Sequence, residues 1–96
     1  MLVLVCYDVS TVTAEGRRRL RRVADLCENH GVRVQFSLFE CPIDQMTWLR
    51  LRHDLLQTME SDEDSLRFYF IDEDAKQKTE HHGVRKPLDL RGPLVF

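Results

Sequence analysis

Asp8 is the residue best placed to do chemistry, because it ends an unbroken apolar run that begins at Met1 and includes Tyr7. The run is rich in β-branched and aromatic residues and is too short to span a membrane, so it predicts a strand buried on both faces. A carboxylate at the end of a central strand lies where α/β folds commonly place their functional groups. The alternative is that Asp8 only satisfies backbone amides of the turn or helix start that follows.

A single carboxylate makes a poor Mg²⁺ site, since Mg²⁺ is usually bound through one or two carboxylates together with phosphate oxygens. Two-fold symmetry would supply the second carboxylate by bringing two copies of Asp8 to one axis. Such a paired site would hydrolyse phosphodiesters through metal-activated water. On this hypothesis Asp8 is both the metal ligand and a catalytic residue of a homodimer.

The second candidate site is a cluster in which five of six consecutive residues are arginine, namely Arg17, Arg18, Arg19, Arg21 and Arg22. On a helix, these side chains cover much of the exposed surface of two turns, and their like charges destabilise the helix. A charge run is usually only a solvated face. Arginine without lysine, however, is the residue type suited to bidentate contacts with phosphate. The cluster therefore predicts binding to phosphate or nucleic acid.

Other chemical motifs are missing from the sequence. It contains no CxxC, HExxH, P-loop or GxGxxG pattern, and His81 and His82 are expected to be a solvated pair. The three cysteines are an odd number in apolar or amphipathic stretches, which predicts buried free thiols in a reducing cytoplasm. An apolar content of 43% and a charged content of 31% are typical of a soluble domain. No signal peptide or membrane span is indicated, so no membrane partner is expected.

Two helices are predicted from apolar stripes that are bounded by capping residues. The first runs from about Thr13 to His30, with Gly31 in the position that follows a helix end. The second begins after the N-cap residue Asp44 and ends before Glu60. The acidic stretch that starts at Glu60 is expected to be no more than a solvated turn.

The remaining strands follow from alternation of apolar and polar residues. The segment 32–41 alternates until Ser37, where the pattern breaks, so it is predicted to bend or to split into two short strands. The aromatic segment from Leu66 to Ile71 predicts the next strand. The apolar end, residues 94–96, predicts a short strand that could dock on another chain.

This order of elements predicts an α+β fold, a ferredoxin-like βαββαβ sandwich with an extra C-terminal strand. A single domain is expected over residues 1–96, with a core of 1–71 followed by a loop and strand at 72–96. The helices of such a sandwich cover one face of the sheet, yet the first strand is apolar on both. The uncovered face is therefore expected to pack on a two-fold-related copy.

Three features together resemble the small CRISPR-associated Cas2 family. They are the dipeptide Tyr7-Asp8 at the end of a strand, the arginine-rich first helix, and the block from Gly31 to Cys41. The family pattern for that block is Gly-x-Arg-Val-Gln-x-Ser-Val-Phe-Glu, from which this chain departs only by Leu38 in place of the commoner valine. The resemblance extends from residue 1 to about residue 70.

The resemblance implies a homodimer with its sheets face to face, in which the C-terminal strand often crosses to the partner. It implies a role in CRISPR adaptation, bound to the Cas integrase and bridging the DNA fragment to be inserted as a spacer. Many members are also described as Mg²⁺-dependent endonucleases acting on RNA or DNA. By this resemblance Asp8 is the metal-binding residue, Tyr7 and Phe39 belong to the catalytic site, and Arg33 joins the arginine cluster in binding nucleic acid.

Several functions stay open on the sequence. The first is a dimeric Mg²⁺-dependent endonuclease, of endoribonuclease type, built on paired copies of Asp8. The second is a non-catalytic subunit that bridges DNA in an integration complex, in which Asp8 is structural. A toxin-type ribonuclease of the same fold is a third. A metal chaperone or small-ligand regulator is disfavoured because the chain lacks CxxC and ligand-binding glycine motifs.

Overall fold

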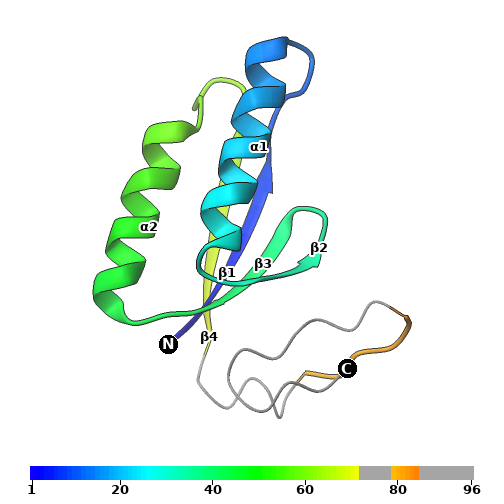
Figure 1. Ribbon diagram of the computed structural model, residues 1–96, viewed down its shortest axis with the longest axis vertical. Helices are drawn as coiled ribbons and strands as arrows, with labels where there is room; N and C mark the ends of the chain where they lie inside the picture. The colour runs from blue at the N-terminus through cyan, green and yellow to red at the C-terminus, as the bar shows by residue number, and fades with distance from the viewer. Residues whose placement is uncertain (72–78, 85–96) are drawn as a thin grey trace.

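The chain forms a four-stranded antiparallel sheet with two helices packed on one of its faces (Figure 1). The computed structural model describes residues 1–71 and 79–84. Its elements are β1 Leu2–Asp8, α1 Ala14–Glu28, β2 Val32–Gln35, β3 Leu38–Pro42, α2 Gln45–Thr58 and β4 Ser65–Ile71. The strand order is β2-β3-β1-β4, which confirms the predicted ferredoxin-like α+β fold.

Strand β1 is central and sends alternate side chains to the two faces of the sheet. Val3, Val5 and Tyr7 point into the core beneath the helices and are almost fully buried. They lie beside core residues of β3 and β4, because Val5 is paired with Phe39 on one side and with Phe68 on the other. The helices complete the core with Val23, Cys27, Trp48, Leu51 and Leu55.

Helix α2 begins after its predicted N-cap, Asp44, and helix α1 begins next to Thr13, where the first helix is predicted to start. The Thr13 side chain accepts a hydrogen bond from the amide of Gly16, and the Asp44 carboxylate accepts one from the amide of Thr47 at 2.8 Å. These bonds satisfy amides that the first helical turn leaves without partners. The hydrogen bond from Thr47 also lowers the pKa of the Asp44 carboxyl.

The role predicted for Gly31 is wrong. Helix α1 ends at Glu28, with Asn29 as a right-handed C-cap, and Gly31 does not adopt a left-handed conformation. Glycine is required there for a different reason: an added Cβ would collide with the carbonyl oxygen of Glu40 and with the Cys41 sulfur. The chain therefore passes directly against β3 as it leaves the helix.

The predicted break near Ser37 is confirmed as the turn between β2 and β3. These strands pair antiparallel, and their register shifts between Arg33 and Gln35. No helix in the part of the chain that the structure describes is long and apolar enough to cross a membrane. The predicted C-terminal strand, residues 94–96, lies outside the described residues.

Candidate active site and nucleic-acid interface

The sheet face turned away from the helices carries the candidate metal ligand. By alternation along β1, Leu4, Cys6 and Asp8 project from this face. Across the neighbouring strands, Leu38 lies beside Cys6 and Tyr69 lies beside Leu4. These five residues define what is called here the open face. The two helices lie on the other side of the sheet and leave this face uncovered (Figure 1). Two further charged residues share the face with Asp8, because Glu40 is paired with Leu4 and Arg67 with Cys6.

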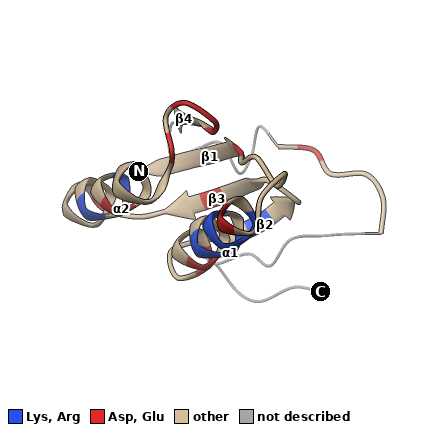
Figure 2. Cartoon of the chain, turned by 90° about the horizontal axis from the view of Figure 1, so that it is seen from above, with Lys and Arg blue, Asp and Glu red and all other residues tan. Residues whose placement is uncertain are grey.

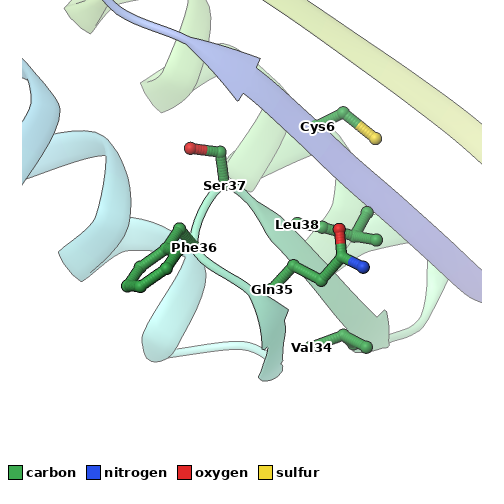
Figure 3. Close-up of a pocket in the computed structure, with 6 residues that line it drawn as sticks. All are labelled: Cys6, Val34, Gln35, Phe36, Ser37 and Leu38. Carbon is green, nitrogen blue, oxygen red and sulfur yellow. The ribbon is translucent and has the colours of Figure 1, made fainter. Parts of the chain in front are cut away.

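A shallow apolar depression lies on this side of the sheet, where the hairpin of β2 and β3 meets β1 (Figure 3). Its volume is about 520 Å³, and it is lined by Cys6, Val34, Gln35, Phe36, Ser37 and Leu38. The depression extends the open face toward the hairpin turn, and it offers an apolar surface for a packing partner rather than a site for chemistry.

Asp8 is exposed at the end of β1, opposite Ser65 at the start of β4. It forms no ion pair within residues 1–71 and 79–84, and those residues contain no group of three His, Cys, Asp or Glu side chains able to hold a metal. Its carboxylate is a hard oxygen ligand of the type that Mg²⁺ prefers. In the part of the chain that the structure describes, Asp8 therefore belongs to no group of three ligands that could hold a metal within one chain.

Tyr7 points away from Asp8, into the core on the helix side of the sheet. Its hydroxyl donates a hydrogen bond of 3.1 Å to the carbonyl oxygen of Phe36, and its ring stacks against Phe39 with centroids 6.2 Å apart. Burial is the main reason that the pKa of Tyr7 is raised, although Arg33 acts in the opposite direction. The structure thus places Tyr7 behind the hairpin turn rather than beside the carboxylate.

Phe39 and Arg33 belong to the same stack as Tyr7. Phe39 is fully buried, and the Arg33 guanidinium carbon lies 5.1 Å from its ring centroid, a cation–π distance. Arg33 is also 3.5 Å from the Glu28 carboxylate. Tyr7, Phe39 and Arg33 are therefore brought together with one another and not with Asp8, and together they support the turn between β2 and β3.

Four of the five arginines of the cluster are exposed on α1, where the basic residues gather in Figure 2. Arg17 donates a hydrogen bond to the carbonyl oxygen of Thr11, and Arg18 lies 3.6 Å from Glu15 in an exposed pair. Exposed pairs of this kind contribute little to stability. Arg21 and Arg22 form no ion pair in the described part of the chain. These four guanidinium groups are available to phosphates, on the layer opposite the open face.

The fifth arginine, Arg19, has a different environment. Its side chain is only 17% exposed, and its Nε donates to Asp64 Oδ2 at 2.9 Å. Its Nη2 also reaches Asp64 Oδ1 and Glu63, each at 3.3 Å. An arginine held in this way cannot also present its fork to a phosphate. The structure therefore separates Arg19 from its four neighbours in the cluster.

Asp64 shows that the acidic stretch after α2 is not only a solvated turn, and that prediction is wrong at this residue. The side chain of Asp64 is fully buried and accepts hydrogen bonds from the amides of Ser10 and Glu60 as well as from Arg19. Burial alone would raise the pKa of Asp64, but these donors together lower it below its usual value. The only sequence signal for this role is an acid directly before an apolar strand.

A family model described as CRISPR associated protein Cas2 matches residues 1–79. The chain belongs to the Cas2 family. It is 54% identical over 96 residues to the CRISPR-associated endoribonuclease Cas2 of Chlorobaculum tepidum, covering 100% of both chains. It is 44% identical over 96 residues to the CRISPR-associated endonuclease Cas2 of Halalkalibacterium halodurans, again covering 100% of both chains.

The Cas2 fold is also found among solved structures. The crystal structure of Streptococcus pyogenes Cas2 at pH 6.5 matches with a TM-score of 0.78 and 43% sequence identity, covering 86% of this chain and 100% of that one. The region matched by the Cas2 family model contains Asp8, the arginine cluster and Asp64. Membership of the Cas2 family therefore applies to the part of the chain that carries the candidate sites.

Asp64→Asn is expected to lower the stability of this Cas2-family protein in a pH-dependent way. At pH 7 the loss should be about 3 kcal/mol, the low end for a broken buried ion pair, because Arg19 retains some exposure. Asp64 has a lowered pKa when folded, so its contribution is complete above the unfolded pKa of about 3.9 and is lost as pH falls through the lower folded value.

Urea denaturation from pH 7 to pH 2 measures this effect. The difference in free energy of unfolding between wild type and Asp64→Asn should be constant down to about pH 5 and should shrink below about pH 4. Asp62→Asn, an exposed acid of the same turn, is the control and should show no such difference. A difference for Asp64→Asn that persists unchanged at pH 2 would contradict the ion-pair account.

Proposed function

We propose that this Cas2-family chain is a Mg²⁺-dependent phosphodiester endonuclease that acts as a homodimer in CRISPR adaptation. The observation that carries the proposal is the position of Asp8, an exposed carboxylate at the end of a sheet face that the helices leave uncovered. The names of the relatives, endoribonuclease and endonuclease, support phosphodiester cleavage as the reaction. RNA, duplex DNA, or both would be the substrate.

The apolar side chains of the uncovered face, Leu4, Cys6 and Leu38, support the homodimer, although Glu40 and Arg67 lie on the same face. A chain of 96 residues has a small core, and burying a second apolar face against a copy of itself adds to that core. Two-fold symmetry is the commonest arrangement for such a self-complementary patch. Because Asp8 lies on the same face as Leu4 and Cys6, pairing of two open faces would place both copies of Asp8 in one interface.

The residues present fit a Mg²⁺ site of this kind. The two copies of Asp8 would supply carboxylate oxygens, and substrate phosphate oxygens would complete the ligand set. A bound Mg²⁺ would supply Lewis-acid activation of water at neutral pH. The protein's own part is to present Asp8 unpaired and to hold the nucleic-acid backbone through the exposed arginines of α1.

A second function, a non-catalytic DNA-bridging subunit, is favoured by one observation. The exposed arginines lie on the helix layer, while Asp8 lies on the other side of the sheet, so a duplex could be held without contact to Asp8. In that case the Cas integrase would be the partner that acts on the bound DNA. Both functions place the protein with nucleic acid in the cytoplasm.

The homodimer is expected to depend on the centre of the open face. Leu38→Asp places a charge beside Cys6 and Val34, so its desolvation would oppose association and give a monomer. Met46→Asp, at a position 72% exposed on α2, is the control and should remain dimeric. Sedimentation equilibrium at micromolar concentration measures the mass, and a wild type that sediments as a monomer would contradict the proposed assembly.

Asp8→Asn is expected to abolish cleavage while leaving the dimer and duplex binding intact. Asparagine preserves the shape of the side chain but removes the charge that a hard divalent ion requires. Cleavage of labelled RNA and DNA should also stop with chelator and return with Mg²⁺. Asp62→Asn is the matched control and should cleave as wild type does.

The outcomes separate the two proposed functions. Equal cleavage by wild type and Asp8→Asn would contradict a catalytic role for Asp8. No cleavage by either protein, with duplex binding retained, would favour the bridging subunit over the nuclease.

Replacing Arg18 and Arg22 together with alanine is expected to weaken binding to all duplex sequences alike. Each neutralised phosphate contributes a slope of about −0.9 in log K against log salt, so the double variant should flatten that slope by up to about 1.8 for each chain that contacts the duplex. Fluorescence anisotropy over a salt series measures the slope. The double variant Arg50→Ala and Arg52→Ala removes two exposed charges from α2 and is the control. Equal slopes for wild type and the α1 variant would mean that this helix faces only solvent.

A further inference from the structure

Asp64 closes a small ring of residues that contains Asp8. Asp8 is paired across the sheet with Ser65, the residue that directly follows Asp64. The Asp64 Oδ1 atom in turn accepts a hydrogen bond of 3.0 Å from the amide of Ser10, two residues after Asp8. The end of β1, the start of β4 and the segment that leaves Asp8 are thereby joined through one side chain.

That side chain is itself rigidly held. Asp64 Oδ2 accepts hydrogen bonds from the amide of Glu60 at 2.8 Å and from Arg19 Nε at 2.9 Å, while Arg19 Nη2 approaches Oδ1 at 3.3 Å. The carboxylate is fully buried, and Arg19 is the cation that neutralises it. A group with four donors and no exposure has one available orientation, so it transmits that orientation to Ser10.

The segment after Asp8 is also fixed from the other side. Helix α1 approaches it so closely that a Cβ added at Gly16 would collide with the carbonyl oxygen of Ser10. Val9, between Asp8 and Ser10, is buried in the core. The backbone on the C-terminal side of Asp8 is therefore anchored at two successive residues, although Asp8 itself is exposed.

We propose that Asp64, with Arg19, is a positioning residue that holds Asp8 in place to bind a divalent cation. The proposal rests on the metal-binding role proposed above for Asp8. A ligand on a fixed backbone loses less freedom on binding than one on a loose loop, and partners that orient ligands typically contribute about 10–100-fold in metal affinity. It also explains why one arginine of the cluster is turned away from solvent: Arg19 serves the carboxylate end of the sheet, not the phosphate-binding face.

The test is a titration of wild type, Asp64→Asn and Glu63→Gln with Mn²⁺, in which electron paramagnetic resonance measures the concentration of free Mn²⁺. Asp64→Asn should bind Mn²⁺ at least about tenfold more weakly. Glu63→Gln removes the exposed partner of Arg19 without touching Ser10, so its affinity should equal that of wild type. Cleavage by Asp64→Asn should recover toward the wild-type rate at saturating Mg²⁺, since the ligand itself is unchanged.

Amide hydrogen exchange at Ser10 provides a readout that needs neither metal nor substrate. Exchange should be faster in Asp64→Asn than in wild type, and unchanged in Glu63→Gln, with all samples at a temperature where circular dichroism shows a folded chain. If Asp64→Asn fails to fold, Arg19→Lys takes its place in the test. Lysine keeps the charge of Arg19 but not its forked guanidinium, so this variant should give an intermediate loss of Mn²⁺ affinity.

The results distinguish this inference from the proposed function. Wild-type binding that Asp8→Asn abolishes, together with wild-type affinity in both Asp64→Asn and Arg19→Lys, would overturn the positioning role alone. Absence of any Asp8-dependent Mn²⁺ binding in wild type would overturn the metal site and the positioning role with it. In that second case faster Ser10 exchange in Asp64→Asn would still identify the contact as purely structural.

Discussion

The two-residue alternation of β1 is the constraint on which both the core and the candidate active site depend. Strand β1 is paired on both edges, with β3 and β4, so each of its side chains must point to one face of the sheet or the other. Val5 and Tyr7 enter the core, while Cys6 and Asp8 take the open face. A slip of one residue would exchange the two sets and bury an ionised carboxylate, which is strongly unfavourable. The register that builds the core therefore also exposes Asp8.

The helices and strands could be predicted from the sequence because their signals are local. The N-caps Thr13 and Asp44 and the break near Ser37 each depend on residues within one turn or hairpin. The prediction for Gly31 is wrong because glycine is used both after helix ends and at close backbone contacts, and the sequence does not distinguish the two. Its actual role is the close passage of the chain over Glu40 and Cys41, a contact that exists only after β3 has packed.

The candidate site was predictable in part. Side chains alternate between the two faces of a strand, so the adjacent residues Tyr7 and Asp8 could not both face one site. The family resemblance nevertheless assigns both residues to the catalytic site. The role of Asp64 depends on partners far away in the chain, with Ser10 separated by 54 residues and Arg19 by 45. Such a contact leaves no periodic or local signal. The sequence shows which residues are charged, but only the fold shows which of them form a buried ion pair.

The separation of positive charge from the open face limits how nucleic acid could engage both proposed sites. The exposed arginines belong to the helix layer, and Asp8 belongs to the opposite side of the sheet. The two layers meet where β1 ends and α1 begins, at the end of the molecule that carries Thr11 and Arg17 (Figure 1). A straight duplex lying across α1 would contact only one layer. A substrate bound along α1 therefore lies on the side of the sheet opposite to Asp8 of the same chain. If both proposed functions hold, binding along α1 and cleavage at Asp8 would make different demands on nucleic-acid shape, because the two sites lie on opposite sides of the sheet.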